Sequence, residues 1–171
     1  LTLTDEDKQM RDLFVSWLKE INLEVSIDEV GNIFGTKPGK NKKLAPVMSG
    51  SHLDTQPKGG RFDGILGVLG ALEVLRTLHE NNIETERSIT VVDWTNEEGS
   101  RIAPAMGSSG VWAGALERDW IYARHDAKGK TFKEELERIG YKGAALAKHW
   151  PLHAYYELHI EQGPQLEREK K

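Results

Sequence analysis

The spacing of apolar positions changes several times along the chain, and each change marks the border of an expected element. Over residues 4–22 the apolar positions recur every three or four residues, which predicts an amphipathic helix capped by Thr4. A second helical pattern covers residues 63–80. Gly67 and Gly70 interrupt this pattern at a cost in helix propensity, so we expect them to mark a close packing contact.

Extended segments alternate with these helices. The run LEVSIDEVGNIFG alternates apolar and polar residues around a turn near Asp28 and Glu29, which is typical of a hairpin. Three further runs, APVMSGSH, SITVVDW and AYYELHI, have the pattern of buried strands. Short helices are expected at SSGVWAGAL and TFKEELERIG, and another begins at PQLEREKK. Strands separated by helices predict an α/β fold with a largely parallel sheet flanked by helices.

Composition narrows the class of protein. The 171 residues have the length of about one domain, and no window approaches the roughly 18 consecutive apolar residues of a membrane helix. A net charge of −4 indicates no nucleic-acid partner, and the lysines of GTKPGKNKKLAP are typical of a solvated loop. The absence of cysteine excludes disulfides and thiolate ligands and fits the cytoplasm. Any metal must therefore be held by His, Asp or Glu.

The two ends of the sequence look truncated. The chain begins at Leu1 without the order of a signal peptide, and its last helical pattern has no stop signal. We therefore expect one domain or part of one.

Polar side chains follow the first buried strand. Residues two apart in a strand face the same side, so His52 and Asp54 are expected to point together, with the carboxylate orienting the imidazole. Asp63 follows at the start of the long helix, where Asp is a common N-cap. The glycines before it also allow the backbone to fold back and bring Asp63 close to His52. Both roles stay open for Asp63.

The other two strands end in the same way. Glu97 and Glu98 follow SITVVDW, where Asn96 and Gly99 supply a turn, and His159 closes the third strand. A glutamate pair is often only a solvated surface feature. The carboxyl ends of strands in an α/β sheet are, however, where ligands bind. Because three strand ends each deliver a metal-ligand side chain, the sequence predicts a metal site at this edge.

Rival motifs fail. GILGVLG lacks the dinucleotide-binding spacing, GSSG is not a nucleophile elbow, and HIEQG lacks the second histidine of H-E-x-x-H. The other histidines have no carboxylate at matching spacing and are interpreted as structural: His79, His125, His149 and His153.

The motifs GSHLDTQPKGGRFDG, DWTNEEGSR and ELHIEQGP, in this order, resemble the amidase/carbamoylase branch of the M20 metallopeptidase family. That branch includes N-carbamoyl-L-amino-acid hydrolases, allantoate amidohydrolases and β-ureidopropionases. The resemblance implies a zinc-exopeptidase-like fold and two divalent metal ions, Zn or Mn, with Co or Ni as alternatives. It implies four metal ligands, with Asp63 bridging the two ions: His52, Asp63, Glu98 and His159.

The resemblance also assigns the remaining roles. Glu97 would be the general base, Asp54 the carboxylate that supports the first histidine, and Gln162 a substrate contact. The substrate would be a small N-carbamoyl or ureido compound. Members of the family are longer, with a dimerisation domain and a return to the catalytic domain that supplies a last histidine. Residues 1–171 would be the N-terminal part of the catalytic domain, inactive alone, of a homodimeric parent.

Two other functions stay open at this point. One is a peptide-cleaving member of the same family. The other is a non-catalytic binding or structural module that retains a metal pocket.

Overall fold

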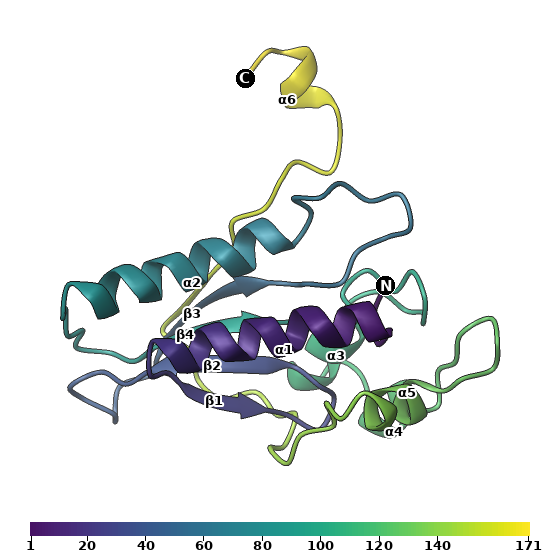
Figure 1. Cartoon of the computed structure of the whole chain (residues 1–171), viewed down its shortest axis with the longest axis horizontal. Coiled ribbons are helices and arrows are strands. Elements are labelled where there is room, and N and C mark those ends of the chain that lie inside the picture. The colour runs from purple at the N-terminus through teal and green to yellow at the C-terminus, as the bar shows by residue number, and fades with distance from the viewer.

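The computed structural model describes all residues, 1–171, as one sheet with helices on both faces (Figure 1). Its strands are β1 (Glu24–Ile27), β2 (Ile33–Lys37), β3 (Val47–Ser51), β4 (Ile89–Asp93) and β5 (Ala154–Tyr156). Its helices are α1 (Asp5–Glu20), α2 (Ile65–Glu80), α3 (Gly107–Trp112), α4 (Arg118–Tyr122), α5 (Phe132–Arg138) and α6 (Gln165–Arg168). None of these helices is both long enough and apolar enough to cross a membrane.

The five strands lie in the order β1-β2-β4-β3-β5. Pairing is parallel between β3 and β4 and between β3 and β5, and antiparallel where β2 meets β1 and β4. Four strands therefore share one direction and β2 alone runs against them. The expected largely parallel α/β sheet is confirmed in strand direction, although half of its pairings are antiparallel because the β1–β2 hairpin forms one side of it.

The two faces of the sheet bury separate apolar cores. α2 packs on β3 and β4, and α1 packs on β1 and β2, so both long helices cover one face (Figure 1). The opposite face carries an aromatic cluster in which Phe34, Trp94 and Trp112 pack with Met48 and Val92. Adjacent residues Val91 and Val92 belong to different cores, as the twofold alternation of a strand requires.

Most of the expected elements are present. Thr4 caps α1 by accepting the Asp7 N–H, and the turn of the β1–β2 hairpin begins at Asp28. Two expectations are wrong in detail. The third parallel strand is only three residues long, so His159 lies beyond it rather than at its end. The short helix α4 has too few residues to show a period and was not expected.

A fully buried arginine joins α1 to the sheet. Arg11 donates from Nε to Asp7 Oδ2 at 2.8 Å, from Nη1 to Gly31 O at 2.9 Å and from Nη2 to Thr95 Oγ1 at 3.0 Å. Its Nη1 also lies 3.7 Å from Oδ2 of buried Asp93, at the end of β4. The positive charge therefore compensates two carboxylates that no water reaches.

This arrangement predicts a large stability loss on Arg11→Met. The variant leaves Asp7 and Asp93 buried without a counter-charge, and we expect it to lower the free energy of unfolding by about 3–5 kcal/mol. Lys8→Met is the matched control, because Lys8 pairs with Asp12 on the exposed side of the same helix and such a pair contributes about 1 kcal/mol or less. Urea denaturation measures both, and equal losses would contradict the account.

Candidate metal centre

The ends of β3 and β4 hold each other through two buried carboxylates. Asp93, the last residue of β4, accepts the Leu53 N–H at 2.9 Å. In return Asp54, just after β3, accepts the N–H groups of Glu97 at 3.0 Å and Glu98 at 3.3 Å. This exchange fixes the two polar loops side by side at the carboxyl edge of the parallel strands, where the sequence predicted a site.

His52 is buried and held in one ring orientation. Its Nδ1 lies 2.8 Å from the backbone carbonyl oxygen of Asp54, whereas the Asp54 carboxylate lies 3.7 Å away, beyond hydrogen-bond distance. A carbonyl only accepts, so Nδ1 carries the proton and Nε2 is left with a free lone pair. The expected contact between the Asp54 carboxylate and this ring is thus longer than a hydrogen bond. The Asp54 backbone orients the ring, while the carboxylate holds the glutamates.

Gly64 makes room for the His52 ring. A Cβ at Gly64 would lie 2.4 Å from the ring atoms Cε1 and Nε2, and the residue has a φ of +71°, which glycine alone adopts readily. Gly64 is also the N-cap of α2, without any side-chain cap. The role of Asp63 as helix N-cap is therefore excluded, and its side chain is free for other contacts.

Asp63 faces the second histidine. Its Oδ1 lies 3.4 Å from His159 Nε2 and accepts a hydrogen bond of 2.8 Å from Gln162 Nε2. His159 Nδ1 lies 2.9 Å from the Ile160 carbonyl and 3.3 Å from Gln162 Nε2; in the tautomer that donates from Nδ1 to this carbonyl, Nε2 is free. Ligand atoms of His52, Asp63 and His159 all lie within 4.8 Å of one another. The structure thus brings together three of the four sequence-predicted ligands.

The two glutamates lie beside this group. Glu97 Oε2 is 3.5 Å from His52 Nε2, and the Glu97 side chain is 31% exposed. Glu98, the fourth predicted ligand, lies outside the three-residue group and accepts a hydrogen bond from Gln56 through Oε2. Its other oxygen, Oε1, is buried with no hydrogen-bond partner. Asn96, between β4 and these glutamates, and Gly99, directly after them, both have a positive φ, as turn residues often do.

The electrostatics of the site reflect crowded acidic groups. Burial raises the pKa of Asp54 to about 7, although the His52 ring and the Glu97 N–H oppose the rise. Burial also raises the pKa of Glu97, against the opposing effect of His52 and with the help of Glu98. Burial lowers the pKa of His52, but the Asp54 carbonyl and nearby carboxylates outweigh it and leave that pKa raised.

These features fit a divalent cation. No lysine or arginine lies within 4.0 Å of the carboxylates of Asp63, Glu97 or Glu98, so no side-chain cation balances them. Two imidazole Nε2 atoms and a carboxylate are ligands that zinc and related cations accept. The 3.4 Å between His159 Nε2 and Asp63 Oδ1 matches two donors that share one ion at about 2.0–2.2 Å each.

Several residues that build the site were not predicted from the sequence. Arg11 and Asp93 have no local signal, because their burial depends on partners far along the chain. Gly64 and the buried Ser51 looked like ordinary turn and strand residues. Only the density of glycines between positions 59 and 70 signalled close packing here.

Comparison with known proteins identifies the family. The family model described as "Peptidase family M20/M25/M40" matches residues 48–171, and the chain belongs to this family. The N-carbamoyl-L-amino-acid amidohydrolase of Rhizobium meliloti is 52% identical over 170 residues, which cover 99% of this chain and 41% of that protein. The ureidoglycolate hydrolase of Oryza sativa subsp. japonica is 35% identical over 173 residues, 97% of this chain and 36% of that protein.

A solved structure agrees with these relatives. The amidase of the hydantoinase/carbamoylase family from Burkholderia multivorans superposes with a TM-score of 0.96 at 57% identity, covering 100% of this chain and 42% of that one. The chain thus spans about two fifths of the length of these proteins. Its relatives are hydrolases, and the family resemblance of the three motifs is confirmed.

The Asp54 contacts predict a local effect of Asp54→Ala. The variant leaves the Glu97 and Glu98 N–H groups without their acceptor, so we expect both amides to exchange hydrogen at least about tenfold faster, since a lost buried hydrogen bond costs about 1–3 kcal/mol. Thr55→Ala is the control, because its side chain contacts neither amide. Hydrogen-exchange NMR measures both amides directly. Unchanged protection in Asp54→Ala would refute the proposed hydrogen bonds from these two amides to the Asp54 carboxylate.

Proposed function

We propose that the chain is the N-terminal part, residues 1–171, of the catalytic domain of a binuclear metal-dependent amidohydrolase. The reaction is hydrolysis of the amide or ureido C–N bond of N-carbamoyl-L-amino acids or related compounds such as allantoate or 3-ureidopropionate. The observation that carries the proposal is the convergence of His52, Asp63 and His159, with both imidazole Nε2 atoms free and Glu97 beside them.

The ligand roles come from the family resemblance, and the geometry supports the first of the two sites. His52, Asp63 and His159 would hold one divalent cation, and Asp63 and Glu98 would hold a second one, for which the unpartnered buried Oε1 of Glu98 is suited. The metals are Zn or Mn, with Co or Ni as alternatives. When bound, the cations lower the pKa of a water to about 7 and stabilise the negative charge that develops at the scissile carbonyl.

Glu97 is the general base of the proposed reaction. Its raised pKa and partial exposure suit a group that takes a proton from the attacking water and delivers it to the departing nitrogen. Asp54 supports it by fixing the Glu97 backbone. Gln162, which donates to Asp63, would contact the substrate as well.

Space for a small molecule lies next to Glu97. A cavity of about 520 Å³ has Glu97 in its wall, together with apolar residues that include Trp94, Met106 and Trp112. This volume lies within the range of about 300–1,000 Å³ typical of ligand pockets. The names of the relatives favour an N-carbamoyl or ureido substrate over a peptide.

The proposal extends to the setting of the chain. The relatives are more than twice as long, so we place the dimerisation domain, the rest of the catalytic domain and a further metal-binding histidine outside residues 1–171. The parent is a homodimer. A cytoplasmic location suits a chain without cysteine.

Ligand counting predicts the metal content of the chain. Two catalytic sites require about six protein contacts, and the four ligands supply five when Asp63 bridges. We expect one firmly bound divalent cation per chain after dialysis, lost in His52→Ala or His159→Ala and kept in the control His79→Ala, on α2. The chain alone should hydrolyse no ureido substrate at a useful rate. Elemental analysis decides, and two tightly held ions, or turnover by the chain alone, would refute the ligand count.

The role of Glu97 is tested in a chimera that joins this chain to the remainder of the Rhizobium meliloti relative. Glu97→Gln removes the proton acceptor and nearly preserves shape, so we expect hydrolysis of an N-carbamoyl amino acid to fall by about 10²–10⁴-fold at unchanged metal content. The unsubstituted chimera is the active reference, and a dipeptide assayed in parallel tests the peptidase alternative. Turnover within threefold of the reference in the variant would eliminate Glu97 as the base.

A further inference from the structure

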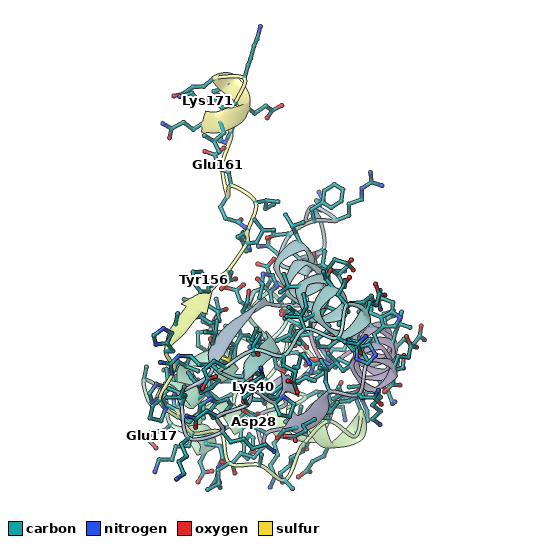
Figure 2. The ribbon with its side chains drawn as sticks, turned by 90° about the vertical axis from the view of Figure 1, so that its left-hand side faces the viewer. Asp28, Lys40, Glu117, Tyr156, Glu161 and Lys171 are labelled. Atoms are coloured by element: carbon teal, nitrogen blue, oxygen red, sulfur yellow. The ribbon has the colours of Figure 1, made fainter.

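His159 lies on a segment that has left the sheet. β5 pairs with β3 only up to Tyr156 opposite Ser49, and no ladder pair follows. Figure 2 shows Tyr156, Glu161 and Lys171 on a stretch that rises away from the body of the molecule. Strand pairing therefore does not place His159, and some other contact has to hold this exposed stretch against the Asp63 side of the site.

Hydrogen bonds from the end of β3 supply one such contact. The buried Ser51 donates from Oγ to Glu157 Oε1 at 2.5 Å, and Tyr155 OH donates to Glu157 Oε2 at 2.7 Å. The Trp94 indole N–H donates to the Tyr155 hydroxyl at 3.0 Å. Glu157 is thus tied to the core through both oxygens, two residues before His159.

The first turns of α2 supply the other contact. A Cβ at Gly67 would lie 2.5 Å from the backbone oxygen of Leu158 and 2.7 Å from Ser51 Cβ. The Leu158 carbonyl therefore rests directly on the bare backbone of the helix. At Gly70, one turn further, the nearest atom to such a Cβ is the Leu158 side-chain Cδ2 at 3.5 Å, an ordinary contact. The close packing expected of these glycines is thus present at Gly67 and absent at Gly70.

We propose that Gly67 and Ser51 are positioning residues that seat the Glu157–Leu158 backbone and thereby place His159 for metal binding. The inference rests on the proposed metal site. Gly67 acts by its missing side chain, which lets the Leu158 carbonyl approach α2. Ser51 acts by holding Glu157 at the end of β3. Neither side chain is itself a ligand.

The matched substitutions Gly67→Ala and Gly70→Ala test whether Gly67 positions the Leu158 backbone. Both gain the same helix propensity, but only the first introduces a Cβ that clashes with the Leu158 carbonyl and with Ser51. We expect zinc affinity, measured by competition with a chelator, to fall at least about tenfold in Gly67→Ala and to stay within twofold of the unsubstituted chain in Gly70→Ala. Equal affinities of the two variants would overturn the inference, and an unsubstituted chain that binds no zinc would overturn the proposed function instead.

Two further variants separate positioning from general destabilisation. Ser51→Ala adds no atom and removes the hydrogen bond to Glu157, so zinc affinity should fall several-fold. Unchanged affinity would contradict the positioning role of Ser51. In a His159→Ala background, which loses the ion on dialysis and is therefore titrated with excess zinc, the Gly67→Ala change should cause no further loss of the residual zinc affinity, because the two effects run through the same ligand. Additive losses would show that Gly67 acts elsewhere and would overturn the inference.

Discussion

The candidate site depends on one reciprocal contact, in which the ends of two parallel strands each supply a buried carboxylate to the other's backbone. Asp93 at the end of β4 accepts the N–H of Leu53, and Asp54 after β3 accepts those of Glu97 and Glu98. Parallel pairing alone brings strand ends to one edge, but it leaves the following loops free. The carboxylates remove that freedom, so the histidine and glutamate loops meet in one fixed arrangement.

This contact requires buried negative charge, and the rest of the fold compensates it. Arg11, itself fully buried, lies 3.7 Å from Asp93 and balances that carboxylate from the helix side. On the open side no lysine or arginine lies within 4.0 Å of Asp63 or Glu98, and the Asp54 carbonyl together with the nearby carboxylates raises the pKa of His52 against the effect of its burial. The acidic excess at the strand ends is what a divalent cation would neutralise, so the scaffold that positions the ligands also favours cation binding.

Sequence reasoning located the elements and the edge of the sheet because apolar periodicity and strand-end polarity are local properties. The strand-end argument named His52, Glu98 and His159, and the family resemblance added Asp63; the structure groups His52, Asp63 and His159 and leaves Glu98 outside this group. Sequence reasoning did not find Arg11, whose partners lie up to 84 residues away. It also left the cap role of Asp63 open, because the need for Gly64 arises only once the His52 ring packs against it.

X-ray absorption spectroscopy at the zinc edge, on the chain loaded with one equivalent of zinc, tests the central claim most directly. The geometry predicts two imidazole nitrogens and at least one carboxylate oxygen at about 2.0–2.2 Å from the ion, and no zinc retained by the His159→Ala chain after dialysis. A spectrum with one imidazole or none in the unsubstituted chain would contradict the assignment of His52, Asp63 and His159 as one metal site.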